Sequence, residues 1–140
     1  MKSNNNNMNS LLAYILLVAI YVLWDAIMFT YIGKSLYGAC YNGITNHYAA
    51  AAIYLLYPAA IAILTLDPSS TKKTALKGAI LGLTGYGLYH FTNMATLERW
   101  PVDTGSDMMK SWPWKITLLD ISLGVIITTI LSLAHKTMEG

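Results

Sequence analysis

The sequence predicts an all-α protein, a four-span transmembrane helix bundle with short loops. Of its 140 residues, 55% are hydrophobic and only 11% are charged. A soluble domain usually carries about 25% charged residues. Four apolar stretches, each close to the ~20 residues that a helix needs to cross a bilayer, fill nearly the whole chain: residues 11–32, 47–66, 74–97 and 115–134. We therefore expect one helical membrane domain, over residues 11–134, in a lipid bilayer.

The chain starts with an asparagine-rich segment, residues 1–10, which has little apolar surface to bury and is expected to be disordered. The span over residues 11–32 differs from a secretory signal peptide, whose hydrophobic region has ~7–15 residues. It also contains Asp25 and precedes three more spans, so we interpret it as a membrane helix. If the asparagine run reflects a viral or protist genome, the membrane is that of an infected host cell or a virion.

Short connections separate the later spans. The first, residues 33–46, is rich in Gly, Asn and Tyr and is expected to form a turn at the membrane interface. The second, residues 67–73, contains an Asp-Pro-Ser-Ser-Thr turn that offers an N-cap to the third helix. The third, residues 98–114, carries three tryptophans. Tryptophan favours headgroup depth, so this connection is predicted on the membrane surface. Residues 135–140 form a C-terminal tail.

Charge gives an expected orientation. With four crossings, both termini and the second connection share one side, which carries Lys2, Lys72, Lys73, Lys77 and Lys136. The other side carries Lys34, Arg99, Lys110 and Lys115, diluted by Glu98, Asp103 and Asp107. Positive residues favour the cytoplasm, so both termini are expected to be cytoplasmic. The net charge of +2 without a basic run gives no electrostatic basis for nucleic-acid binding.

The sequence carries little sign of an enzyme. Its single cysteine, Cys40, excludes an internal disulfide and a multi-cysteine metal site, and palmitoylation or pairing with another chain stays open. The motifs of zinc proteases, nucleotide-binding loops, serine hydrolases and redox dithiols are absent. Ser122 lies two residues from Asp120 and therefore off its helix face, which argues against a Ser-His-Asp triad.

Three spans contain polar groups that hydrocarbon disfavours: Asp25, His90 with Asn93, and Asp120. Ionisable side chains at membrane depth are costly, and they mark candidate sites. With a helical rise of ~1.5 Å per residue, Asp25 and His90 lie about 10 Å from the ends of their spans and Asp120 about 8 Å. The first and third connections share a side in a four-span chain. All four groups are therefore predicted at similar heights in one leaflet.

The third span arranges its polar residues on one face. Tyr86, His90 and Asn93 follow i, i+4 and i+7 spacing, and Thr96 flanks them. The candidate polar cluster is Asp25, Tyr86, His90, Asn93, Thr96 and Asp120. Earlier in the span, Gly78 and Gly82 form a small-xxx-small pair that permits close helix packing. Self-association through this pair, giving a homo-oligomer, stays open.

Two carboxyl groups and an imidazole at one depth resemble a proton relay, because burial and neighbouring charge tune their proton affinities. Asp25, His90 and Asp120 are also a candidate ligand set for a divalent cation, with Asn93 as a further donor. The leading hypothesis is therefore a protein that binds or conducts a proton, a cation or a small polar solute.

Two other classes compete with this hypothesis. In the first, a structural or assembly protein uses the polar cluster only to fix helix packing through interhelical hydrogen bonds, each worth ~0.6–2 kcal/mol. In the second, a lipid-modifying enzyme needs a nucleophile accessible to headgroups, and none is evident in the sequence.

The later spans carry motifs of a known family. Residues 89–97, Tyr-His-Phe-Thr-Asn-Met-Ala-Thr-Leu, are followed by Trp112-Pro113 and by Leu118, Asp120 and Gly124. They resemble the pattern Tyr-Asp-x-Thr-Asn-x-Ala-Thr-Leu, Trp-Pro and Leu-x-Asp-x-x-Trp-Gly of the predicted four-span membrane proteins grouped as domain of unknown function 2177.

The resemblance covers about residues 11–134, and Asp25 matches the family's early Leu-Asp motif. The chain departs where His90 replaces an aspartate, where Leu123 replaces a tryptophan, and where extra residues precede Trp112. The resemblance implies a four-span architecture and supports the assignment of these residues to the candidate site. It implies no activity.

Overall fold

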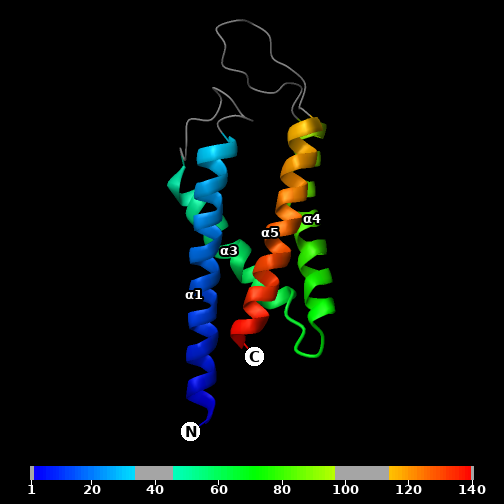
Figure 1. Ribbon diagram of the computed structural model, residues 1–140. Coiled ribbons are helices and arrows are strands. Elements are labelled where there is room, and N and C mark those ends of the chain that lie inside the picture. The colour runs from blue at the N-terminus through cyan, green and yellow to red at the C-terminus, as the bar shows by residue number, and fades with distance from the viewer. Residues whose placement is uncertain (1, 34–45, 97–113, 140) are drawn as a thin grey trace, which may run out of the picture.

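The computed structural model describes residues 2–33, 46–96 and 114–139. These residues form four α-helices, α1 (Lys2–Met28), α3 (His47–Leu64), α4 (Thr71–Thr96) and α5 (Trp114–Glu139), shown in Figure 1. A short π-helix, η1 (Phe29–Gly33), continues α1. The all-α prediction is therefore confirmed for the described chain. Cys40 and the tryptophan-containing third connection, for which we predicted a surface position, lie outside the described residues.

The helices pack as an antiparallel bundle. α4 and α5 run in opposite directions and make the most extensive contact, and α3 crosses obliquely between α1 and the α4–α5 pair (Figure 1). The start of α1, the end of α5 and the turn between α3 and α4 lie at one end of the bundle, which we call the terminal end (Figure 1). The end of α4 and the start of α5 lie at the opposite end.

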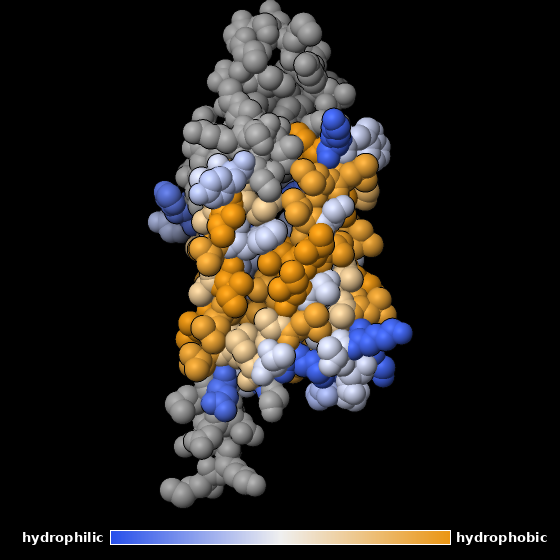
Figure 2. Space-filling view, viewed as in Figure 1, coloured by the Kyte–Doolittle hydropathy of each residue, from blue (hydrophilic) through white to orange (hydrophobic). Residues whose placement is uncertain are grey.

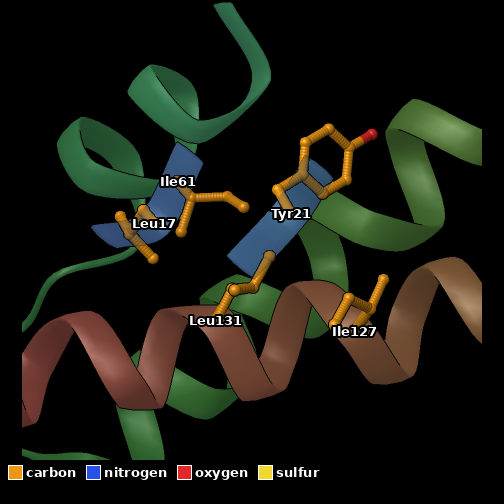
Figure 3. Close-up of a cluster of buried hydrophobic side chains, with 5 residues drawn as sticks. All are labelled: Leu17, Tyr21, Ile61, Ile127 and Leu131. Carbon is orange, nitrogen blue, oxygen red and sulfur yellow. The ribbon is translucent and has the colours of Figure 1, made fainter. Parts of the chain in front are cut away.

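A small apolar core joins three of the helices. Leu17 and Tyr21 from α1, Ile61 from α3, and Ile127 and Leu131 from α5 are buried together (Figure 3). The Tyr21 hydroxyl points out of this core toward α4 (Figure 3). A polar atom therefore extends from the core toward the candidate site.

The outer surface is apolar on every helix. Large aliphatic side chains such as Leu23, Ile63, Leu76 and Ile130 are more than half exposed. On the face in Figure 2 they form a belt, with the most hydrophilic side chains toward its two ends. Exposed apolar surface of this extent indicates a lipid-facing or partner-facing protein.

Three helices are long and apolar enough to cross a membrane, over Asn9–Tyr31, His47–Leu64 and Trp114–Glu139. α4 has the length but not the apolar composition, because Lys72, Lys73 and Lys77 lie in its first two turns and His90 and Asn93 near its end. The four-span prediction is thus confirmed for three spans by length and composition.

The N-terminal segment differs from the expected disordered tail. α1 begins at Lys2, so the helix extends backward through the asparagine-rich residues. Adding a residue to an existing helix gains one hydrogen bond without a new nucleation cost, and the apolar span beginning at residue 11 supplies that existing helix.

The α3–α4 turn is tied to the end of α5. Ser70 caps α4 by accepting a hydrogen bond from the Lys73 backbone N–H at 3.3 Å, as the turn sequence predicts. Lys136 of α5 donates to the backbone carbonyl oxygens of Asp67 and Pro68. The hydrogen bond from the Ser69 hydroxyl lowers the pKa of Asp67, and the ammonium of Lys77, 3.5 Å away, adds to this effect. The turn therefore holds a charged carboxylate among lysines at the membrane boundary.

Candidate functional site

Glycines set the distance between α4 and α5. A Cβ added to Gly78 would lie 2.6 Å from Ser132 Oγ, and one added to Gly82 would lie 2.7 Å from the Gly124 carbonyl oxygen. Both glycines thus face α5 within the same chain. Beyond them the Tyr86 ring covers Gly124. Because the helices are antiparallel, one further turn brings His90 opposite the turn that carries Asp120.

His90 and Asp120 form a direct contact between α4 and α5. His90 Nε2 lies 2.6 Å from Asp120 Oδ2. The His90 side chain is fully buried, whereas 26% of the Asp120 side chain is exposed. A nitrogen–oxygen distance this short indicates a direct hydrogen bond, whose donor depends on the tautomer of the imidazole. One proton can therefore be shared or exchanged between the imidazole and the carboxyl group.

Asp25 brings a third helix to the site. Its half-buried side chain on α1 forms a hydrogen bond with Tyr54 of α3 and interacts electrostatically with Asp120. Asp25 therefore lies near the His90–Asp120 pair. The two aspartates have separate hydrogen-bond partners and act on each other through charge.

Tyrosines line the interior next to this group. The hydroxyls of Tyr21 and Tyr86 are 3.5 Å apart, and the Tyr57 hydroxyl lies 2.8 Å from Thr128 Oγ1. The ring centroids of Tyr21 and Tyr57 are 5.3 Å apart, and those of Tyr57 and Tyr86 are 6.0 Å apart. Tyr21 and Tyr86 also interact electrostatically with Asp25. The polar cluster is thus continued toward the middle of the bundle by hydroxyl groups.

The remaining predicted residues lie differently. Asn93 is half-buried and shares a side-chain hydrogen bond with Tyr89 of its own helix. Thr96 is exposed, and its hydroxyl donates to the Thr92 carbonyl oxygen at 2.8 Å. The structure brings Tyr86 and His90 to the helix interface but does not bring Thr96 there.

The geometry gives no support to a bound metal ion. Among the described residues, no group of three or more His, Cys, Asp or Glu side chains is arranged to hold one. Asp25, His90 and Asp120 therefore do not assemble into the divalent-cation ligand set that their sequence positions allow.

Sequence reasoning missed the tyrosines on α1 and α3. Tyr54 and Tyr57 lie inside α3, away from the span ends where tyrosines serve as interface anchors. Tyr21 precedes Asp25 by four residues and thus shares its helix face. Both the mid-span position and the i, i+4 spacing were available signals.

The fold and the cluster define a small helical membrane protein with ionisable groups buried between its helices. A family model described as "Predicted membrane protein (DUF2177)" matches residues 10–107. The match covers more than half of the chain, so the chain belongs to this family, as its motifs indicate. The match includes Asp25 and His90 and ends before α5, so Asp120 lies beyond it. No curated protein and no solved structure matches the chain.

Proposed function

We propose that the protein crosses the bilayer four times and carries protons through the cluster formed by Asp25, His90 and Asp120. The observation that carries this proposal is the 2.6 Å contact between a fully buried imidazole and a carboxyl group, with a second carboxyl group in electrostatic range. Histidine is the side chain whose charge changes most readily near neutral pH. Buried ionisable groups in membrane helices commonly serve proton relays.

The properties of α4 support a fourth crossing. Its 26 residues span about 39 Å at ~1.5 Å per residue, enough for the ~30 Å hydrocarbon core. His90 contacts α5 and is shielded from lipid. Lys72 and Lys73 lie in the first turn, where long cationic side chains can reach the interface. The low apolar content of α4 therefore reflects its ends and its buried face.

The lysines also support an orientation. Lys72, Lys73, Lys77 and Lys136 lie at the terminal end of the bundle, in and around the α3–α4 turn. Positive residues favour the cytoplasmic side. On this basis both termini are cytoplasmic and the His90–Asp120 pair lies nearer the opposite surface.

A structural role is the second candidate, and a specific observation favours it. Three side-chain hydrogen bonds each join a different pair of helices: Asp25 with Tyr54, His90 with Asp120, and Tyr57 with Thr128. Such bonds can fix helix packing without any transport. Gly78 and Gly82 contact α5 of the same chain, so they give no support to a homo-oligomer.

Proton flux into liposomes containing the purified full-length chain tests the proposal. A pH-sensitive dye inside the vesicles reports the flux driven by a potassium diffusion potential. We expect flux from the wild-type protein, and we expect Asp120→Asn and Asp25→Asn to reduce it to the level of empty liposomes. The matched control is Ser122→Ala, because Ser122 is exposed on α5 and its hydroxyl bonds to the Leu118 carbonyl oxygen. Unchanged flux in both Asn variants would contradict the proposal. Absence of wild-type flux, together with a lower melting temperature for Asp120→Asn, would favour the structural role.

A further inference from the structure

A second histidine is buried near the terminal end of the bundle. His135 on α5 is 4% exposed. Its Nε2 lies 3.7 Å from Glu139 Oε1, and Glu139 Oε2 accepts a hydrogen bond from Ser10 of α1 at 3.1 Å. The Nδ1 atom of His135 is buried and has no hydrogen-bond partner within the described part of the chain. Buried polar atoms in proteins are nearly always paired with protein or water, so this nitrogen indicates a bound water molecule.

Buried hydroxyls lie between this histidine and the polar cluster. Thr128, Ser132 and His135 follow i, i+4 and i+7 spacing on one face of α5, and both hydroxyl residues are fully buried. Thr128 is hydrogen-bonded to Tyr57 at 2.8 Å, and Ser132 donates to the Thr128 carbonyl oxygen at 2.7 Å. The Tyr57 ring in turn packs against Tyr21 and Tyr86. A line of polar groups thus follows the inside of an otherwise apolar bundle.

The length of this line matches a path across much of the bilayer. Fifteen residues separate Asp120 from His135, which is about 22 Å at the helical rise of ~1.5 Å per residue. Hydroxyl groups both donate and accept hydrogen bonds, so they can pass a proton without carrying a lasting charge.

We propose that His135, with water at Nδ1, is the proton-exchanging group at the terminal end of a path that begins at the His90–Asp120 pair. This inference rests on the proposed proton function and adds its route. From the His90–Asp120 pair the path leads to Asp25 and then past Tyr21 and Tyr86 to Tyr57. It continues along α5 through Thr128 and Ser132.

The transfer is balanced at every step. The Tyr57 and Thr128 hydroxyls are in direct contact, so between them one O–H bond breaks as another forms. The Ser132 hydroxyl donates to the Thr128 backbone carbonyl oxygen, so from Thr128 to His135 the proton passes through water, which gains one O–H bond as it loses another. A proton taken up at the His90–Asp120 pair is matched by one released from the His135 imidazole to water. Burial disfavours the charged form of His135, and the Glu139 carboxylate 3.7 Å away offsets part of that cost. Lys136 is held by the carbonyl oxygens of Asp67 and Pro68 in the α3–α4 turn.

Thr128 and Thr129 provide a matched pair for the test. Thr128→Val removes the hydroxyl that bonds to Tyr57. Within the described part of the chain, Thr129→Val removes a hydroxyl that bonds only to the Val125 carbonyl oxygen. In the same liposome assay, we expect Thr128→Val and His135→Gln to lose proton flux and Thr129→Val to keep it. Circular dichroism melting in detergent checks that each variant is folded. If His135→Gln does not fold, the comparison of Thr128→Val with Thr129→Val still tests whether the proton route passes through Thr128.

The outcomes separate this inference from the proposed function. Wild-type flux that requires Asp120 but persists in folded Thr128→Val and His135→Gln proteins would overturn the route through His135 and leave the proton function standing. Equal loss in the Thr128→Val and Thr129→Val proteins would also overturn the route. Absence of any wild-type flux would overturn both.

Discussion

Replacing Gly82 with alanine is expected to destabilise the protein strongly. The added methyl group would lie 2.7 Å from the Gly124 carbonyl oxygen and 2.8 Å from Val125 Cα. Both atoms belong to the α5 backbone, so they can move away only if the whole helix moves. Overpacking of this kind costs about 1–3 kcal/mol. Circular dichroism melting of the detergent-solubilised protein measures the loss.

Gly87→Ala is the matched control for Gly82→Ala. A methyl group at this position meets only the Phe91 ring, at an ordinary contact distance of 3.7 Å. Alanine favours a helix over glycine by about 0.8–1.0 kcal/mol, so this variant should melt at the wild-type temperature or above it. A similar loss of stability in both variants would mean that close contact between α4 and α5 is not the cause.

Replacing His90 and Asp120 together is expected to separate stability from function. His90→Leu alone leaves the Asp120 carboxyl group without its partner, which should cost about 1–3 kcal/mol. His90→Leu with Asp120→Leu should recover most of that stability, because apolar side chains often replace a buried ion pair without a net loss. Proton flux should be absent from the single and the double variant alike. Denaturant unfolding and the liposome assay measure the two properties on the same preparations.

Thr96→Leu and Ser122→Leu are controls for this comparison. Both side chains are exposed on the same two helices and bond only to backbone carbonyl oxygens in the contacts found. They should preserve both stability and flux. A double variant that conducts protons as well as the wild type would assign His90 and Asp120 to helix packing alone.

The helices were predictable because apolar length is a direct property of the sequence. The second span, expected over residues 47–66, is observed as His47–Leu64. The third, expected over residues 74–97, begins earlier at Thr71, because Ser70 caps the helix ahead of the lysine-rich turn. That this helix crosses the membrane stays a prediction, because it is long enough but not apolar enough by composition. Gly78, Gly82 and His90 of this helix are buried against α5, and composition alone counts them as if they faced lipid.

The helical rise predicts similar heights for the polar groups, but it does not predict their hydrogen-bond partners. Hydrogen-bond partners depend on how α1 and α3 rotate and cross, which the sequence does not specify. This explains why the Asp25 contact with Tyr54 was not anticipated. Thr96 lies off the face that carries His90 for a simpler reason. It follows His90 by six residues, which turns its side chain about 120° away around a helix of 3.6 residues per turn, and there it is exposed.

Nitrogen NMR of histidine-labelled protein in lipid bicelles tests the central claim most directly. The chain has three histidines, His47, His90 and His135, so assignment by substitution is simple. We expect the His90 Nε2 signal to show a strongly hydrogen-bonded proton, to change in the Asp120→Asn protein and to stay unchanged in the Ser122→Ala protein. A His90 signal that is the same in the wild-type and Asp120→Asn proteins would contradict the pairing of the two groups, and with it the proton path.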